Sequence, residues 1–184
     1  MTKRAGRSAE NDDVLAEVMN AGTKHVCLVG KTHDFHVETA LGIGLEENVE
    51  NIRASIAYVV AQGREALFDA EHFFDGYKAN PAYALTCLKA AHDAGARWGV
   101  LCDTTGGTLP HAVYQITKAV IDAGIAGDRI GIRTHNETEH AVACSLAAIA
   151  AGARPVQGTL TRLGAACRNA DVPRVLPTPR LHRH

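Results

Sequence analysis

Short apolar runs alternate with longer helical stretches along almost the whole chain, and this alternation constrains the fold more than any other feature of the sequence. The stretches between the runs place apolar residues at helical spacing and close repeatedly on Ala-Gly, at Gly95, Gly124 and Gly152. Such alternation is typical of βαβ units and predicts an α/β fold with a parallel sheet. The runs that we read as its five strands are residues 25–31, 65–71, 98–104, 130–136 and 155–161.

Composition narrows the classes of function. The chain has 184 residues and 46% hydrophobic content, which is enough for one substantial core. A net charge of -1 argues against nucleic acid and anionic membranes as partners. The sequence contains no apolar run of the roughly 20 residues that a membrane span needs, and its polar start is unlike a signal peptide. We therefore expect a cytoplasmic protein that acts on small molecules.

The five cysteines do not suggest a disulfide framework or a thiolate metal site. They lie far apart, are odd in number and form no CxxC pair. We expect Cys27 and Cys102, both inside strands, to be small buried side chains.

Polar side chains gather where three of the expected strands end. Strands buried on both faces are nearly all apolar, so charged groups at their carboxyl ends indicate an active-site rim. The three groups are Asp69, Glu71, His72 and Asp75; Asp103, Thr104 and Thr105; and Arg133, His135, Asn136 and Glu137.

Several segments resemble one family, the enzymes that condense an acyl-CoA with an α-keto acid. The likeness is strongest to the bacterial citramalate synthase type and extends to 2-isopropylmalate synthases. It rests on TKRAG (residues 2–6), LEENVENI (45–52), GREALFDAEHFFDGYKANPAYAL (63–85), VLCDTTGGTLPH (100–111), THNETEHAVACSLAAIAAGA (134–153) and VQGTLTRLG (156–164).

The resemblance implies part of a metal-dependent (β/α)8 TIM barrel, related to the barrel of HMG-CoA lyase. The five strands would be the fourth to the eighth of that barrel. The Arg-Asp-Gly motif that ends the first strand in the family does not occur in this sequence. We therefore expect a partial catalytic barrel over residues 1–171 and an irregular or disordered tail over residues 172–184, which is rich in Pro and Arg.

The family binds a divalent metal (Mn, Mg or Zn) with an HxH pair, the first-strand Asp and an Asn. Here the first His of the pair is Arg133, whose guanidinium has no lone pair to donate. His135 and Asn169 match the remaining His and the Asn. The segment before Asn169 departs from the family pattern, with Ala at residues 165 and 166 in place of Glu and Arg. Two of four ligands remain, which predicts weak metal binding.

Other site residues are also carried over from the resemblance. Glu71 corresponds to a strand-end glutamate that organises substrate, and it is our candidate base or hydrogen-bond acceptor. A carboxylate that is merely solvated or paired with Lys78 is the alternative. Thr104 corresponds to a threonine that contacts the keto acid carboxylate, with Asp103 shaping the turn. A helix cap at Thr104 is the alternative.

The other histidines and a glycine-lysine pair have weaker functional interpretations. His33 and His36 have HxxH spacing but no third ligand nearby. His72 is expected on the face of its strand opposite Glu71. Gly30 and Lys31 resemble half of a P-loop without its upstream glycine.

Two functions remain open from the sequence, and a third is disfavoured. The first is an acyltransferase that joins acetyl-CoA to a short α-keto acid such as pyruvate, in isoleucine or leucine biosynthesis, with impaired activity in this chain. The second is an inactive barrel remnant that acts through association with another chain. A lyase on the same scaffold is disfavoured by the DAEHFFDGYK segment. Open strand edges predict self-association or a homo-oligomer in either case.

Overall fold

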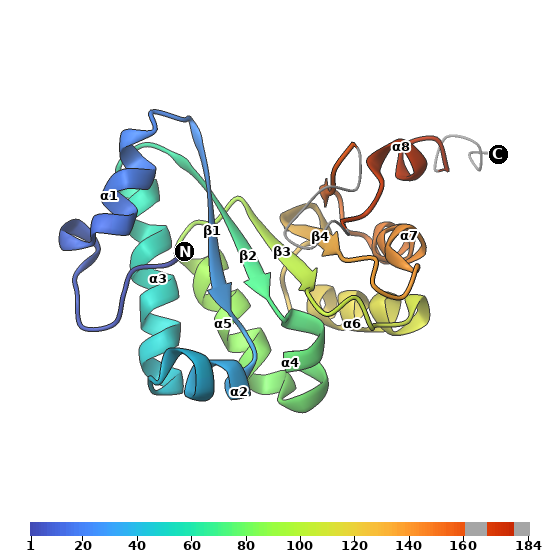
Figure 1. Ribbon diagram of the computed structural model, residues 1–184, viewed down its shortest axis with the longest axis horizontal. Helices are drawn as coiled ribbons and strands as arrows, with labels where there is room; N and C mark the ends of the chain where they lie inside the picture. The colour runs from blue at the N-terminus through green and yellow to red at the C-terminus, as the bar shows by residue number, and fades with distance from the viewer. Residues whose placement is uncertain (161–168, 179–184) are drawn as a thin grey trace. The chain divides into compact units, whose positions relative to one another are not determined.

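The computed structural model of the protein describes residues 1–160 and 169–178 (Figure 1). The chain divides into two compact units, Met1–Val100 and Leu101–His184, and the division falls within the third strand. The five strands are neighbours in the order β1-β2-β3-β4-β5. Pairing is parallel between β1 and β2 and between β4 and β5. The predicted parallel α/β architecture is confirmed.

The first unit alternates strands with helices. Its helices are a 3-10 turn η1 (Ala9–Asn11), α1 (Asp13–Asn20), α2 (Asp34–His36), the π-helix η2 (Val37–Leu41), α3 (Leu45–Ala61), α4 (Phe73–Ala79) and α5 (Pro81–Asp93). Its strands are β1 (His25–Lys31), β2 (Glu65–Glu71) and most of β3 (Trp98–Asp103).

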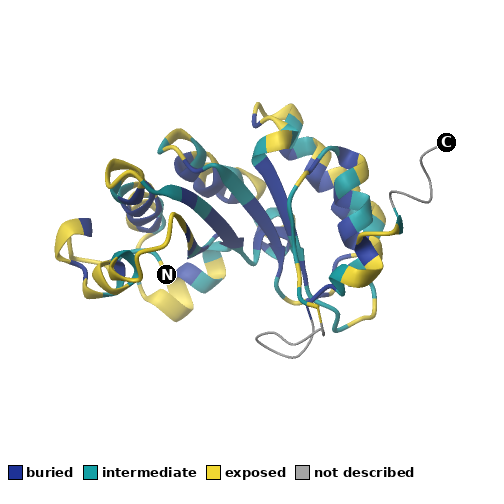
Figure 2. Ribbon diagram, turned by 90° about the horizontal axis from the view of Figure 1, so that it is seen from above, coloured by how far each residue is buried: buried dark blue, intermediate teal, exposed yellow. Residues whose placement is uncertain are grey.

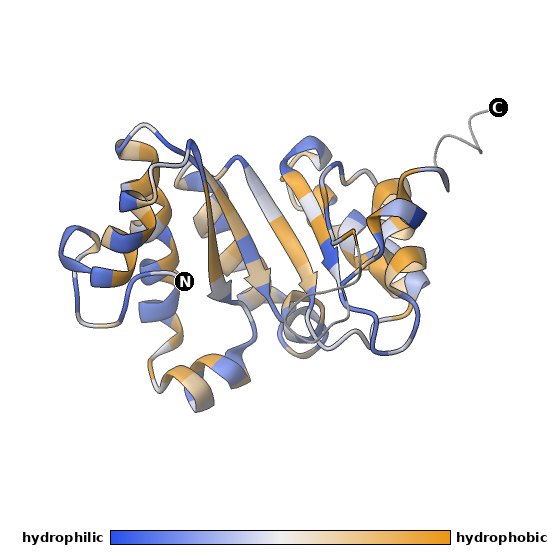
Figure 3. Cartoon of the chain, turned by 45° about the horizontal axis from the view of Figure 1, so that its top comes forward, coloured by the Kyte–Doolittle hydropathy of each residue, from blue (hydrophilic) through white to orange (hydrophobic). Residues whose placement is uncertain are grey.

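One face of the β1–β2 pair carries the core of this unit. Leu28 of β1 and Phe68 of β2 are fully buried, and α3 buries Ile52 and Ile56. Figure 2 shows long buried stretches, in dark blue, along the strands of the sheet. Apolar and polar residues alternate along the ribbon of α3 (Figure 3), as expected for a helix with one buried side. Gly63 follows the helix with φ +72°, so it is the left-handed residue expected at this helix end.

A buried asparagine joins three elements of the first unit. The Asn48 side-chain amide on α3 donates 2.9 Å hydrogen bonds to the Lys31 carbonyl oxygen and the Tyr83 hydroxyl on α5. Asn48 is 1% exposed, so both of its amide protons need partners inside the protein. The amide therefore fixes the last residue of β1 against two helices.

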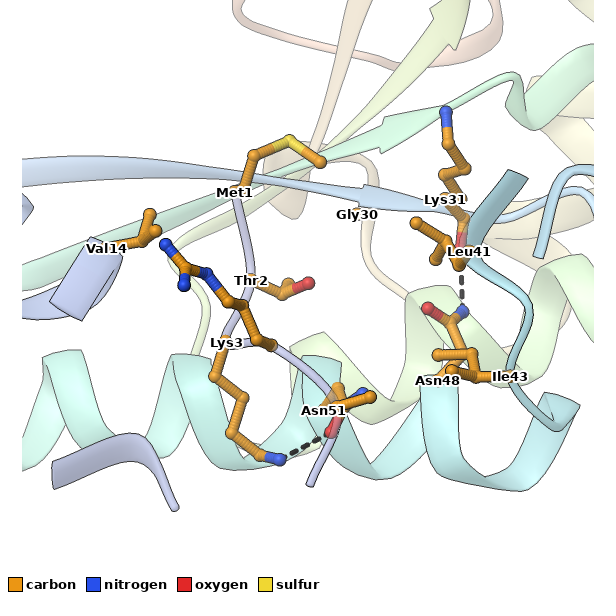
Figure 4. Close-up of a pocket in the computed structure, with 12 residues that line it drawn as sticks. Met1, Thr2, Lys3, Val14, Gly30, Lys31, Leu41, Ile43, Asn48 and Asn51 are labelled. Atoms are coloured by element: carbon orange, nitrogen blue, oxygen red, sulfur yellow. Dashed lines mark hydrogen bonds between the residues drawn. The ribbon is translucent and has the colours of Figure 1, made fainter. Parts of the chain in front are cut away.

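The amino-terminal segment lies against β1 and α3. Thr2 donates its backbone N–H to the Val29 carbonyl oxygen at 3.0 Å. Lys3 donates its backbone N–H to the Ser55 hydroxyl at 2.8 Å and its ammonium group to the Asn51 side-chain oxygen (Figure 4). A cavity of about 300 Å³ lies beside this segment, and Val14, Gly30, Leu41 and Ile43 are among its lining residues.

The second unit contains the end of β3 and two further strands. The elements that follow β3 are α6 (Pro110–Asp122), a 3-10 turn η3 (Gly127–Arg129), β4 (Ile130–Thr134), α7 (Ala141–Ala151), β5 (Val156–Gln157) and α8 (Val172–Val175). Ile130 and Ile132 of β4 are fully buried, as is Ala148 of α7. Small residues on α7 bring its backbone close to its neighbours, and α7 packs against α6 and β4.

The structure corrects several details of the sequence analysis. β4 and β5 end earlier than expected, and α8 forms one short helical turn in the region predicted to be irregular. Cys102 is buried as predicted, but the prediction for Cys27 is wrong. Cys27 is exposed because it points to the face of β1 opposite the core formed with α3. Cys167 lies outside the described residues. No helix in the described part of the chain is long and apolar enough to cross a membrane.

The packing of α4 gives a first prediction. A Cβ atom on Gly76 would lie 2.6 Å from the Thr32 carbonyl oxygen and 2.9 Å from the His33 Cα, both rigid backbone atoms. Gly76→Ala should therefore lower the free energy of unfolding by about 1–3 kcal/mol, although alanine is the better helix former. Urea denaturation measures the change. Gly107→Ala, whose Cβ would meet nothing closer than 3.9 Å, should be near neutral; equal effects would contradict the prediction.

Candidate active site

Glu71 is held at the end of β2 by the residues that end β1. The parallel register places Lys31 opposite Glu71, and the Lys31 ammonium lies 2.7 Å from the Glu71 Oε2 atom. Thr32 donates both its backbone N–H and its hydroxyl to the Glu71 carbonyl oxygen, at 3.0 and 2.9 Å. The side chains of Lys31 and Glu71 are 16% and 27% exposed, which reduces solvent screening of the pair. Glu71 thus presents an oriented carboxylate at the strand end.

The pairing with Lys78 that we considered for Glu71 is not the one in the structure. Lys78 lies 3.0 Å from Asp75, one helical turn away on α4. Lys31, which the sequence suggested only as part of a weak phosphate motif, is the partner of Glu71. The parallel register was the signal for this pair, because Lys31 and Glu71 both end a seven-residue strand.

Three histidines lie together beyond these strand ends. The imidazoles of His36 and His72 stack with centroids 4.1 Å apart and an interplanar angle of 16°. His33 meets His36 edge-on at 5.1 Å. His72 is the N-cap of α4 with φ 58° and ψ 32°, a left-handed conformation, rather than a strand residue facing away from Glu71. Burial is the main cause that lowers the pKa values of His36 and His72 below the ordinary 6.5.

Asp34 anchors the loop that carries His33 and His36. Its carboxylate accepts hydrogen bonds from the Asn80 side-chain amide and the Phe35 backbone N–H at 2.9 and 2.8 Å, and His33 Nδ1 lies 2.9 Å away. The bond from Asn80 is the main cause that lowers the pKa of Asp34. Among the described residues no three His, Cys, Asp or Glu side chains are placed to hold a metal ion.

In the second unit, Asp103 closes the turn that follows β3. Its Oδ1 accepts a 2.7 Å hydrogen bond from the Thr108 hydroxyl, and its Oδ2 accepts the Thr108 backbone N–H at 3.3 Å. Its carbonyl oxygen accepts the N–H groups of Gly106 and His135 at 3.2 Å each. Asp103 is 1% exposed, so its contacts shape the turn, as expected from the sequence. Thr108 was not singled out in the sequence.

Thr104 lies in the turn directly after Asp103 and is half-buried. It does not cap the next helix, because α6 begins at Pro110 with Leu109 as its N-cap. The alternative of a helix cap at Thr104 is therefore wrong. The turn leaves a short polar side chain immediately beyond a buried strand end.

His135 and Asn169 are brought together by the backbone. They form an isolated antiparallel bridge, and Ala170 donates its N–H to the Thr134 carbonyl oxygen at 3.1 Å. Asn169 is 7% exposed, and its buried Oδ1 atom has no hydrogen-bond partner among the residues that the structure describes. A buried acceptor without a partner is unusual, and a cation would satisfy it.

The donors present nevertheless do not make a divalent-metal site by themselves. His135 and Asn169 supply two neutral donors, and Arg133 brings a fixed positive charge to the same strand two residues before His135. Residues 165 and 166 of the preceding segment lie outside the described residues. Zn²⁺ is usually held by four ligands, and Mg²⁺ by six oxygen ligands that include one or two carboxylates. We therefore derive no chemical step through a metal.

Glu137 is a further buried group that sequence reasoning did not assign. Its Oε2 atom is buried without a hydrogen-bond partner and lies over Gly106, where an added Cβ would be 2.3 Å away. The Thr138 hydroxyl donates to the Gly106 carbonyl oxygen at 2.5 Å. The loops after β3 and β4 therefore interlock at a glycine with φ +65°.

Parallel strands that end in oriented polar side chains define the class of protein: an α/β scaffold with its functional groups at the carboxyl ends of the strands. Residues 5–177 match the HMGL-like family. The chain belongs to this family.

Relatives and solved structures agree with this assignment. The chain is 45% identical over 180 residues to the (R)-citramalate synthase of Aquifex aeolicus and 44% identical over 186 residues to that of Synechocystis, in each case over 98% of this chain and 34% of the relative. It is 32% identical over 145 residues to a probable 2-isopropylmalate synthase of Methanopyrus kandleri, over 79% of this chain and 28% of the relative. The chain thus spans about one third of the citramalate synthases that it matches.

The structure resembles HMG-CoA lyases at low sequence identity. The TM-score is 0.80 for the enzyme from Bacillus subtilis, with 16% identity over 97% of this chain and 61% of that chain. For the enzyme from Brucella melitensis it is 0.79, with 16% identity over 90% of this chain and 62% of that chain. These likenesses concern the fold, and they confirm the expected partial TIM barrel.

The interlocked loops give a second prediction. Gly106→Ala should lower the free energy of unfolding by about 2 kcal/mol or more, because it combines left-handed backbone strain with a clash against Glu137. Thermal and urea denaturation measure the loss.

Gly42→Ala is the matched control, since Gly42 has φ +64° and no atom within 4 Å of the added Cβ. Its free energy of unfolding should fall only by the cost of the left-handed backbone conformation. The double variant Gly106→Ala, Glu137→Ala should recover the part of the lost unfolding free energy that is due to the clash with Glu137. If Gly42→Ala costs as much as Gly106→Ala, the clash with Glu137 is irrelevant.

Proposed function

We propose that this chain is the catalytic-barrel part of an acyltransferase that condenses acetyl-CoA with pyruvate to form citramalate, in the cytoplasm and in the biosynthesis of branched-chain amino acids. The observation that carries the proposal is its 45% identity, over nearly its whole length, to an (R)-citramalate synthase. The oriented carboxylate of Glu71 at the end of β2 supports it, because the reaction needs a strand-end base or acceptor.

The proposed reaction forms one carbon–carbon bond. A base removes a proton from the methyl group of acetyl-CoA, and the resulting enolate carbon attacks the keto carbon of pyruvate, whose oxygen takes up a proton. Water then cleaves the thioester and releases free coenzyme A and citramalate. The HMGL-like family is metal-dependent in general, and a divalent cation supplies carbonyl polarisation there.

Six side chains are assigned to this reaction, two of them as candidate metal ligands. Glu71 accepts a proton or hydrogen bond from the reacting groups, and Lys31 keeps its carboxylate oriented. Thr104 offers its hydroxyl to the pyruvate carboxylate. Asp103 holds the turn on which Thr104 lies, through its bonds to Thr108. His135 and Asn169 remain candidate metal ligands on the strength of the resemblance and of their adjacency.

The test is the release of coenzyme A thiol from acetyl-CoA, with and without pyruvate and with and without Mn²⁺ or Mg²⁺. We expect slow, pyruvate-dependent release that falls by about 100-fold or more in Glu71→Gln, because the variant lacks a basic carboxylate. Glu65→Gln, at the other end of the same strand, is the control and should retain the activity. Pyruvate-independent release, or equal activity of Glu71→Gln, would contradict the proposal.

The second function, an inactive barrel remnant that acts through association, is favoured by one observation. β1 is an edge strand in the described chain, with β2 as its neighbouring strand on one side and only the amino-terminal segment against Val29 on the other. Unpaired strand edges pair readily with other chains. The remnant is supported if no pyruvate-dependent thiol release occurs at any metal concentration.

Self-association is expected under both functions, and sedimentation velocity measures it. We expect the chain to form dimers or larger species at micromolar concentration. Cys27→Lys, which places a charge at an exposed position of the edge strand, should raise the dissociation constant by about 10-fold or more. His111→Lys, at an exposed position on α6, is the control. A compact monomer at all concentrations would refute the expectation.

A further inference from the structure

We propose that the stacked imidazoles of His36 and His72 form a pH-sensitive latch that holds the loop of residues 33–43 against the start of α4 and releases it as the pH falls. The stack lies beside Glu71, but the reaction proposed there uses neither imidazole. The latch is a property of the first unit alone, and it concerns groups for which the proposed function has no use.

The geometry of the stack is the first argument. The two rings are almost parallel, with centroids 4.1 Å apart. Neutral imidazoles tolerate this arrangement as other offset aromatic pairs do, whereas a protonated ring would bring positive charge against its neighbour. His33, edge-on to His36 at 5.1 Å, adds a third imidazole to the same cluster.

Burial, the largest effect on the stack, outweighs the nearby charges. Lys31 lowers the pKa values of His36 and His72 and His33 lowers that of His36, whereas Glu71 and Asp75 raise the pKa values of both rings. Each carboxylate among them already has a cation of its own: Glu71 pairs with Lys31 at 2.7 Å, and Asp75 pairs with Lys78 at 3.0 Å. The nearby Asp34 carboxylate is likewise engaged, by Asn80 and His33. A new imidazolium would therefore compete for anions that are already paired.

The loop is attached in a way that suits a latch. It contains the three-residue helix α2 and the π-helix η2, and residues 38–42 are exposed. Val37 is fully buried and Asp34 bonds to Asn80, so these two anchors hold the loop near its start. The stack of His36 on His72 adds a contact with α4, whose Gly76 also lies against the backbone of Thr32 and His33. The loop also has few buried contacts, and such segments open locally at low cost in free energy.

His72 itself stores strain. It has φ 58°, a left-handed conformation that is unfavourable for a residue with a Cβ atom. The contact with His36 stabilises this conformation, so loss of the contact makes the conformation less favourable. The latch therefore couples the loop after β1 to the first turn of the helix after β2.

The sign of the pH effect follows from burial, which lowers both histidine pKa values in the closed state. In the open state the rings meet water and regain a pKa near 6.5. The open state then binds more protons below that pH, so opening becomes more favourable as the pH falls. Asp34, whose pKa is lowered, stays ionised over the same range, so its anchor persists.

The experiment is amide hydrogen exchange of residues 36–41, followed by NMR between pH 7.5 and 5.5 and corrected for the intrinsic exchange rate. Each ring whose pKa is lowered in the closed state should lower protection as the pH falls, by at most about 10-fold over this range, and the two rings together by at most about 100-fold. The amide of Gln62, which donates to the Tyr58 carbonyl oxygen at the end of α3, serves as the internal reference and should not respond.

Variants separate the latch from general acid destabilisation. His36→Phe keeps an aromatic ring that cannot be protonated. In this variant the pH-dependent fall in protection should be smaller by up to about 10-fold than in the wild type. His36→Phe combined with His72→Asn, a residue that tolerates the left-handed conformation, should abolish it. His111→Phe, an exposed histidine on α6, should behave as the wild type.

Two outcomes would overturn the latch. One is loop protection that does not change with pH in the wild type, and the other is identical pH dependence in His36→Phe and the wild type. If the variants fail to fold, histidine ring titrations of the wild type decide the question. A pKa at or above 6.5 for both His36 and His72 in the closed loop would refute the latch, and lowered values together with the pH-dependent exchange would support it.

Discussion

The amide of Asn48 fixes the point from which the site of the first unit is built. It is buried on α3 and donates to the carbonyl oxygen of Lys31, so the last residue of β1 has one position relative to the helix behind it. The parallel register then places Glu71 opposite Lys31, and Thr32 binds the Glu71 backbone. A buried donor without a partner costs about 1–3 kcal/mol, so loss of the carbonyl contact would be unfavourable. The orientation of the Glu71 carboxylate therefore depends on a residue that does not touch it.

Much of the fold followed from the sequence because its signals are local. The alternation of apolar runs and helical spacing predicted five parallel strands, and Gly63 marked the end of α3 through its left-handed conformation. The ends of β4 and β5 were placed too late, because polar residues after a strand do not reveal where its hydrogen bonds stop. Cys27 was misplaced for a related reason. Strand periodicity shows which residues share a face, but it does not show what covers that face.

The candidate site was predicted in part. The sequence singled out Glu71, Asp103 and His135, but it did not identify Lys31 or Thr108 as the partners that hold the two carboxylates. Such partners depend on strand register and turn geometry, which are set by packing between segments distant in sequence. The stack of His36 on His72 was missed because the left-handed turn at His72 takes its ring off the strand. Weak metal binding could be predicted from the types of side chain alone, since His135 and Asn169 beside the Arg133 guanidinium form an incomplete coordination shell.

The π-helix that follows α2 has a consequence for how this chain can vary in length. Each turn of a π-helix closes over one residue more than an α-helical turn, so Val37–Leu41 contains slack in its backbone. Loss of a single residue here would tighten the turn into an ordinary helix without breaking the chain. A one-residue deletion could therefore shorten this connection. It would also rotate the side chains before the deletion away from their present neighbours.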